Sequence, residues 1–426
     1  MVAVHPPGPK TVAIVGAGLT GLLAAHGLQQ NGFNAVVFER EVSLDERQRD
    51  WTMLVHWAMP IFEKLVPKDI LADLHKAVCN PYLDFDEQVE SLPCYNGVTG
   101  GLLLRSPTPG ARRVTRRALR RLLARRLDIR WNKTVTAVSS TENGVRISFE
   151  GEDKFYADFL LGADGSSSKV RELLLGFETA RPRPSGFLFA TGITKYADAR
   201  KTNAIVEAHP VASLMMGTGS VGAVGGTSST PKLLLSSLLI SKAHTFRFGY
   251  VVMSISDPED ASTWTTFWTK IWRAESVKLS GQEALEYIEN NTSPLRDVFQ
   301  SAIDWTPRDS SVHIDEMKYW IPTPWDNLGG RVTLAGDAAH PMLIYRGQGF
   351  QHSITDVNNY VETLTRLESL GDDAALRGEA LMNYDAEMID RGSKAVQQSL
   401  EEAEKSLDPE KIKHMLMATK GHVRSA

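Results

Sequence analysis

Four short runs of apolar residues stand out along the chain, and each ends at small residues or at a carboxylate. They are Thr11–Val15, Ala35–Phe38, Ala157–Leu161 and Val332–Ala335. Continuous apolar runs, rather than alternating ones, are typical of strands that are covered on both faces. We therefore predict an open α/β sheet whose strands come from distant parts of the sequence.

Other segments show the periodicity of hairpins and of amphipathic helices. Val135–Phe149 alternates apolar and polar residues on either side of the turn sequence Glu-Asn-Gly at 142–144, which predicts a β-hairpin. Within Ala111–Arg130, four leucines recur at i, i+3, i+4 and i+8. This spacing predicts a helix with one buried stripe.

The character of the chain changes between Phe187 and Ser311. This interval contains alternating runs such as Phe246–Ser254, with helical patterns near Gly281–Asn290 and Pro294–Ile303. We read it as a second lobe built mainly on an antiparallel sheet, in which the tryptophans belong to the core.

The predicted fold class is α/β (mixed α+β), with a Rossmann-like nucleotide-binding domain, an interleaved antiparallel-sheet substrate domain and a C-terminal helical tail. The expected division is residues 1–186 for the first part of the Rossmann-like domain and 187–311 for the substrate lobe. The second part of the Rossmann-like domain then covers 312–395, and the charged amphipathic tail covers 396–426.

The first apolar run leads directly into a glycine-rich turn, Gly16-Ala17-Gly18-Leu19-Thr20-Gly21, and then into helical sequence. A second strand follows and ends in Glu39. Strand, glycine turn, helix, strand and acidic residue form the dinucleotide-binding fingerprint in its full context. Gly16 allows the tight turn, Gly18 admits a pyrophosphate, Gly21 lets helix and strand pack closely, and Glu39 accepts from ribose hydroxyls. The alternative is a core βαβ turn without ligand.

A second G-x-G-x-x-G occurs at Gly217–Gly222, but its context is different. The residues after it are poor helix formers, and no Asp or Glu lies between Ala208 and Ser256. We interpret it as a hairpin in the antiparallel sheet. A second nucleotide would therefore bind without a Rossmann domain of its own.

Two carboxylates follow buried strands at their carboxyl ends, where ligands bind in open α/β sheets. Asp164 lies in the sequence Gly-Ala-Asp-Gly, and serves either a ligand or the cap of the next helix. Asp337 precedes a loop with Gly347 and Gly349 and then a helix from about Phe350. A helix N-terminus offers free N–H groups to a phosphate or a carbonyl oxygen.

Composition narrows the class of protein. The 426 residues are 42% hydrophobic and 23% charged, with a net charge of −4. The arginine-rich segment 111–130 could suggest nucleic acid, but the acidic balance and the lack of interleaved aromatics favour a solvated helix face. No signal peptide and no membrane span are expected, and two unpaired cysteines, Cys79 and Cys94, predict a reducing, cytoplasmic location. No metal site is predicted, and the oligomeric state is left open.

Three patches in order make a more specific pattern than any one alone: the Gly16–Gly21 turn with Glu39, the segment Leu160–Arg171, and the segment Arg331–Asp356. Together they resemble the single-component FAD-dependent aromatic hydroxylases, the group A flavoprotein monooxygenases, and especially their fungal secondary-metabolism members. The resemblance covers the FAD-binding parts, about half of the chain. The interval Phe187–Ser311 carries no matching motif.

The resemblance implies roles at matching positions. The adenosine end of FAD would be bound around Glu39, an arginine at the start of the basic helix would reach the phosphates, Asp337 would hold the ribityl chain, and the backbone of Gly347–Gln351 would lie beside the flavin ring. The cofactor-binding residues expected from this resemblance are Gly16, Gly18, Gly21, Glu39, Arg40, Arg116, Asp164, Asp337, Gly347, Gly349, Phe350 and Gln351.

Two positions depart from the family pattern. Ile344 stands where many members have proline, beside the re-face pocket of the flavin, and Gln351 stands where they have asparagine. Three residues next to the cofactor motifs are candidates for activating a phenolic substrate: His56, Tyr345 and Arg346. For His56 the alternative is a core histidine, and for the other two a role in pinning Gly347.

The implied reaction uses NADPH or NADH to reduce FAD, and O₂ to form a flavin C4a-hydroperoxide. That species hydroxylates or epoxidises a small aromatic, polyketide, alkaloid or terpenoid-like substrate. One alternative is an FAD-bound cyclase or dehydrogenase without oxygen insertion, and another is a non-catalytic flavin-binding protein. A flavin halogenase is disfavoured because only Trp320-Ile321-Pro322 matches the end of its W-x-W-x-I-P element.

Overall fold

A computed structural model describes residues 8–83, 90–97, 99–207, 212–217, 246–371, 373–406, 409–412 and 414–416. Its first layer is a five-stranded parallel sheet in the order β18-β11-β1-β2-β7. The strands are β1 (Thr11–Val15), β2 (Asn34–Phe38), β7 (Asp128–Arg130), β11 (Phe159–Gly162) and β18 (Val332–Leu334). The four apolar runs are thus confirmed as strands of one parallel sheet.

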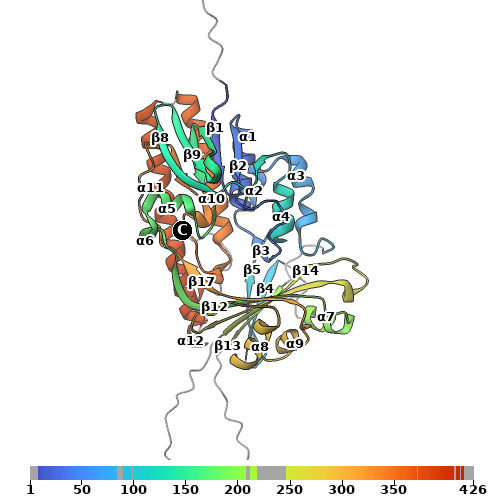
Figure 1. The fold of residues 1–426 in the computed structure, drawn as a ribbon. Helices are drawn as coiled ribbons and strands as arrows, with labels where there is room; N and C mark the ends of the chain where they lie inside the picture. The colour runs from blue at the N-terminus through green and yellow to red at the C-terminus, as the bar shows by residue number, and fades with distance from the viewer. Residues whose placement is uncertain are drawn as a thin grey trace, which may run out of the picture.

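Helices cover this sheet on both faces and give the Rossmann-like layer arrangement (Figure 1). They include α1 (Leu19–Gln30), α4 (Arg116–Leu123), α5 (Lys169–Leu175) and α10 (Gly349–Leu370). Smaller elements on this side are β3 (Thr52–Val55), β6 (Arg112–Thr115), α2 (Met59–Leu65), α3 (Lys68–Ala72) and α6 (Phe177–Ala180). The hairpin predicted at Val135–Phe149 is present as β8 (Val135–Thr141) and β9 (Gly144–Phe149), extended by β10 (Lys154–Ala157).

The second layer is an eight-stranded sheet in the order β16-β17-β12-β15-β14-β13-β4-β5. Its strands are β4 (Ser91–Asn96), β5 (Leu102–Pro107), β12 (Arg183–Thr194), β13 (Ala212–Gly217), β14 (Phe246–Ser254), β15 (Thr265–Arg273), β16 (Leu279–Ser280) and β17 (Ser311–Tyr319). The pairs are antiparallel except β13 with β4. The sheet therefore draws strands from both sides of the predicted interval 187–311.

Helices α7 (Ala199–Val206), α8 (Gly281–Asn291) and α9 (Phe299–Asp304) lie on the face of this sheet that points away from the Rossmann-like part (Figure 1). They pack on Trp268 and Trp272, which are buried core residues as expected. Both cysteines are free and buried, which agrees with two isolated thiols. Only Gly217 of the second G-x-G-x-x-G belongs to the described residues, so the hairpin expected there lies outside them.

Two sequence predictions need correction. The helix expected over Ala111–Arg130 is wrong at both ends, because residues 112–115 form β6 and residues 128–130 form β7, leaving only Arg116–Leu123 helical. The C-terminal tail does not begin as a separate element at residue 396, since α11 runs unbroken from Ala374 to Ser406 and is followed by α12 (Pro409–Ile412).

Candidate functional site

The glycine turn after β1 is shaped by close backbone packing. Gly16 has a φ of +109°, and a Cβ built there would lie 2.4 Å from the carbonyl oxygen of Ala163. A Cβ on Gly21 would lie 2.0 Å from the carbonyl oxygen of Gly16. A Cβ on Gly18, which caps α1, would meet nothing within 4 Å. The first and last glycines therefore pack the turn, and the middle one leaves room for a ligand to approach the backbone.

Glu39 supports this turn as well as bordering it. One carboxylate oxygen accepts from the N–H of Ala17 at 2.7 Å, and the other accepts from the N–H of Glu41 at 3.1 Å. Arg120 donates from Nε to the carbonyl oxygen of Ala17 at 2.7 Å and pairs with Glu41 at 2.7 Å. Arg120 is thus a buried arginine of α4 that faces the glycine turn. The sequence alone did not distinguish it from the other eight arginines of segment 111–130.

A cavity of about 140 Å³ opens between this turn, the end of β2 and the end of β11. It collects six of the expected cofactor-binding residues: Gly16, Gly18, Glu39, Arg40, Arg116 and Asp164. Its cations exceed its carboxylates, since Arg47, Arg120, Lys133 and Lys169 also line it. A small cavity with excess positive charge at a helix N-terminus suits a phosphate-bearing ligand.

Arg116 is a second largely enclosed cation that lines this cavity. Burial, together with the positive charges of Arg47 and Arg120, lowers its pKa to about 10. Its guanidinium lies 4.6 Å from the ring centroid of Trp51. No ion pair holds it within the described part of the chain, so it is available to a phosphate group.

Asp164 caps helix α5. Its carboxylate accepts from the Ser168 hydroxyl and from the N–H groups of Lys169 and Val170, at 2.6 and 3.1 Å for the two amides. Burial raises the pKa of this carboxyl against the effect of those hydrogen bonds. The helix-cap role weighed from sequence is therefore present, and Asp164 also lines the cavity.

Arg171 connects this helix to the loop after β18. It is fully buried and donates to the carbonyl oxygens of Ala338 at 2.8 Å and Ala180 at 2.9 Å. Its guanidinium lies 4.7 Å from the ring centroid of Trp320. Sequence reasoning placed Arg171 in a motif but assigned it no contact with the loop after β18, because the Ala338 carbonyl lies 167 positions away along the chain.

Asp337 lies in the turn between β18 and α10. Within the part of the chain that the structure describes, its carboxylate accepts no hydrogen bond. The residue is exposed, yet the protein packed around its carboxyl still desolvates it and raises its pKa against the charges of His340, Arg116 and Arg171. A Cβ on Gly349 would lie 3.9 Å from Oδ1 of Asp337. The site thus presents an unpaired acceptor beside the start of a helix.

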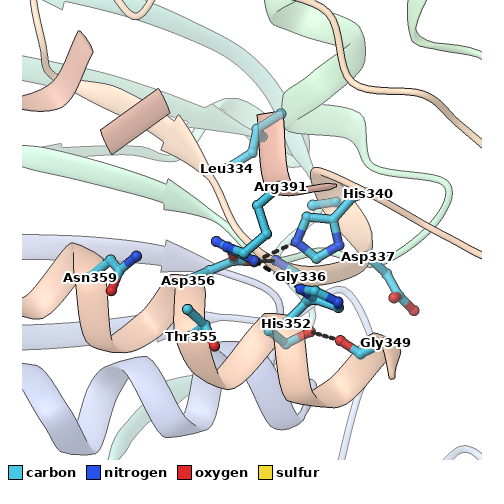
Figure 2. A network of polar contacts seen from close by, with 12 residues as sticks. Leu334, Gly336, Asp337, His340, Gly349, His352, Thr355, Asp356, Asn359 and Arg391 are labelled. Carbon is cyan, nitrogen blue, oxygen red and sulfur yellow. Dashed lines mark hydrogen bonds and ion pairs between the residues drawn. The ribbon is translucent and has the colours of Figure 1, made fainter. Parts of the chain in front are cut away.

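A buried polar network fixes the turn that carries Asp337 (Figure 2). Asp356 accepts from the N–H of Gly336 at 2.8 Å, from Nε2 of His340 at 2.7 Å and from Arg391 at 2.7 Å. Arg391 also contacts Nδ1 of His352 at 3.2 Å. Burial, with the neighbouring cations, lowers the pKa of His352 to about 3. The spacing between residues 356 and 391 gave no sign of this link.

Gln351 and His56 join strand β3 to the glycine loop. The Gln351 side chain donates to the carbonyl oxygen of Leu54 at 2.7 Å and accepts from the N–H of His56 at 3.1 Å. Nε2 of His56 lies 3.3 Å from the carbonyl oxygen of Gly347, which has a left-handed φ of +61°. His56 is 2% exposed, as expected of a core histidine. Phe350 is half-buried on the first turn of α10.

The side chain of Tyr345 contacts β12, and that of Arg346 contacts α11. Tyr345 is 1% exposed and packs edge-on against Phe187, and burial raises its pKa to about 12. Arg346 donates to the side-chain oxygen of Gln398 at 2.6 Å. These contacts favour the loop-pinning alternative for both residues. Ile344 is 43% exposed in the same short helical turn.

The parallel sheet carries a glycine turn, a glutamate at the end of β2 and a second strand-turn-helix unit. These features define a dinucleotide-binding fold. Comparison with known proteins narrows this class. Residues 14–64 match the NAD(P)-binding Rossmann-like domain family, and residues 304–399 match the FAD binding domain family. The FAD-dependent monooxygenase phnB of Penicillium herquei is 32% identical over 97% of this chain and 95% of its own.

Two further similarities agree. The FAD-dependent monooxygenase dbaB of Emericella nidulans is 30% identical over 81% of this chain and 84% of its own. The fold resembles 2,6-dihydroxypyridine-3-hydroxylase from Arthrobacter nicotinovorans, with a TM-score of 0.67, 16% identity and 94% coverage of both chains. The chain belongs to the FAD-dependent monooxygenases.

The described residues fit FAD. The open space beyond Gly18 leaves room for a pyrophosphate, and Arg116, which has no ion pair among the described residues, supplies a cation for it. The carboxylate of Asp337, which accepts no hydrogen bond there, supplies an acceptor for ribityl hydroxyls. No cluster of His, Cys, Asp or Glu in the described ranges is arranged for a metal ion. None of the helices described combines the length and apolar character that a bilayer crossing requires.

Proposed function

We propose that this protein uses NADPH or NADH and O₂ to hydroxylate or epoxidise a small aromatic, polyketide, alkaloid or terpenoid-like molecule. Bound FAD would supply the redox and oxygen chemistry. The observation that carries the proposal is that the structure offers one site for each end of FAD. The cavity beside Glu39 suits the adenosine end, and Asp337 with the Gly347–Gln351 loop suits the ribityl and flavin end.

Within this proposal, the protein's own residues bind and orient. Gly16, Gly18 and Gly21 hold the turn, while Glu39, Arg40 and Arg116 border the adenosine and phosphate groups. Asp337 accepts from the ribityl hydroxyls. His56 and Gln351 hold the Gly347–Gln351 loop against strand β3, so that the backbone of this loop would lie beside the flavin ring. For catalysis we retain His56 as the first candidate; Tyr345 and Arg346 hold the loop.

Oxygen incorporation tests the proposal directly. Purified protein is incubated with NADPH, with NADH and with a panel of phenols and indoles, and reduced-nicotinamide consumption selects active compounds. Product formed under ¹⁸O₂ should carry one labelled oxygen by mass spectrometry. Product without label would overturn oxygen insertion and support the FAD-bound cyclase or dehydrogenase. Bound flavin with no stimulation by any compound would favour a non-catalytic flavin-binding protein.

A further inference from the structure

Two arginines on contacting strands of different sheets act on each other electrostatically, and neither forms an ion pair with a carboxylate among the described residues. Arg113 is on β6 of the Rossmann-like part, and Arg247 is on β14 of the eight-stranded sheet. These two strands are in contact, and the positive charge of Arg247 helps to lower the pKa of Arg113. The pair therefore spans the junction of the two layers.

Arg247 points to the side of the sheet that faces the predicted flavin loop. Its neighbours Tyr250 and Val252 pack against α8 and α9 on the other face. Arg247 donates from Nη1 to the carbonyl oxygen of Tyr345 at 2.8 Å, and its guanidinium lies 5.3 Å from the Tyr345 ring centroid. Its acceptor, Tyr345, is two residues before Gly347, the loop residue that we assign to the flavin.

Arg113 approaches the same place from the opposite side. It pairs with Leu54 in the β3–β6 ribbon, and the carbonyl of Leu54 accepts from Gln351. One Nη1 donates to the Thr52 hydroxyl at 3.1 Å, and the buried Nε has no partner within the described ranges. Arg113 therefore keeps one unused donor.

Arg113 and Arg247 differ in charge balance from two other deeply placed arginines, Arg120 and Arg391. Arg120 and Arg391 each pair with carboxylates. Neither Arg113 nor Arg247 has an ion pair among the residues that the structure describes, and burial lowers the pKa of both. Two neighbouring cations removed from water without a counter-ion are costly, and an anion held between them offsets that cost.

We infer that Arg113 and Arg247 form an anion-binding subsite for the substrate, which holds an ionised oxygen beside the flavin loop. A guanidinium group donates two parallel hydrogen bonds to a carboxylate, or a charge-assisted hydrogen bond to an enolate oxygen. These bonds orient the substrate as well as attracting it. Neither residue lines the cavity beside Glu39, so this subsite is separate from the phosphate site. The substrate class is thereby an aromatic carboxylate or an acidic enol, an inference that rests on the proposed function.

Matched pairs of ligands test this inference. The FAD-loaded protein is titrated with 2-naphthoate against 2-naphthamide, and with 4-hydroxycoumarin, an acidic enol, against the neutral 4-methoxycoumarin. Binding is followed by flavin absorbance and by tryptophan fluorescence. At least one anion should bind about 10-fold more tightly than its neutral partner. The pair that shows the preference identifies the carboxylate or the enolate as the recognised group.

Variants separate this subsite from general binding. Arg247→Met and Arg113→Met should each abolish the preference, whereas Arg247→Lys should keep part of it. Arg200→Met, at an exposed arginine on α7, is the control and should change nothing. Retained FAD shows that a variant is folded. Equal binding of anion and neutral partner in the wild type, or a preference that survives both Met variants, overturns the subsite.

The two proposals fail in different ways. If the protein does not couple nicotinamide oxidation to oxygen insertion, the proposed function fails, but fluorescence titration still measures the anion preference. If labelled oxygen is inserted and no anion preference exists, the subsite alone is wrong.

Discussion

The buried carboxylate of Asp356 accepts a hydrogen bond from the backbone N–H of Gly336 at 2.8 Å. Gly336 immediately precedes Asp337, so the residue that we propose to hold the ribityl chain is oriented by another carboxylate on the following helix. A turn fixed in this way does not need to reorganise when the cofactor binds, which favours affinity.

We expect Asp356→Asn to destabilise the protein by about 3–5 kcal/mol, because it removes the fully buried carboxylate that pairs with Arg391 and His340, even though Arg391 keeps its second pair with Glu387. Urea unfolding at pH 7 measures this. Asp390→Asn, whose ion pair with Lys394 is exposed, is the control and should cost less than about 1 kcal/mol. Equal effects of the two substitutions would contradict the assigned role.

The same carboxylate predicts an acid-sensitive stability. Burial alone would raise the pKa of Asp356, but His340 and Arg391 outweigh it and hold the pKa below its usual range. A lowered folded-state pKa stabilises the protein above the unfolded value of about 4, and this contribution is lost as the pH falls further. Unfolding midpoints measured from pH 6 to pH 3 should therefore drop more steeply for the wild type than for Asp356→Asn.

Asp337→Ala should leave the protein folded but unable to retain FAD. The carboxylate accepts no hydrogen bond in the described structure and its pKa is raised by desolvation, so its removal costs the fold little. The flavin-to-protein absorbance ratio after gel filtration reports retention. Asp309→Ala, at an exposed turn, should keep full occupancy. Full occupancy in Asp337→Ala as well would refute its role as the ribityl anchor.

The glycine turn predicts opposite outcomes at neighbouring positions. Gly16→Ala should destabilise the fold by about 1–3 kcal/mol, because the φ is positive and the new Cβ would overlap the carbonyl oxygen of Ala163. Gly18→Val should change stability by less than about 0.5 kcal/mol but weaken FAD binding, since its side chain enters the cavity. Thermal unfolding and flavin titration of the two apoproteins distinguish these effects.

Lys270 predicts a stability that rises towards alkaline pH. It is 1% exposed, donates to the Thr292 hydroxyl at 2.6 Å, and burial lowers its pKa to about 7. Between that value and the unfolded value of about 10.4, the unfolded chain binds the additional proton, so the free energy of unfolding increases with pH. From pH 7 to pH 9 the gain should approach about 2 kcal/mol and should be absent in Lys270→Met. Lys278→Met, on the surface, should retain it.

Ile344→Pro tests the position that departs from the family pattern. Leu343 already has the extended conformation that a following proline requires, with ψ of 151°, and residue 344 begins a short helical turn where proline is tolerated. We expect unfolding free energy to change by less than about 0.5 kcal/mol. A larger loss would mean that the loop depends on the isoleucine side chain itself.

The parallel sheet and the glycine turn were predictable because continuous apolar runs and glycine spacing are local signals. The inclusion of β4 and β5 in the eight-stranded sheet was not predictable, because the pairing of Cys94 with Leu214 joins segments 120 positions apart. Likewise, the leucine spacing revealed the buried stripe of α4 but could not tell Arg120 from its arginine neighbours. Inward orientation there depends on Ala17 and Glu41, which only the folded chain brings near.

Helix α11 acts as a brace along one edge of the molecule. Near its start, Tyr384 donates to the carbonyl oxygen of Leu334 at 3.1 Å, and near its end Glu404 pairs with Arg273 of the other sheet. Between these two contacts, Ser399 accepts from the N–H of Leu343 at 3.1 Å. One rigid rod is thus fastened to both layers and to the loop between them. A ligand must consequently reach the junction of the two layers from a side that α11 does not cover.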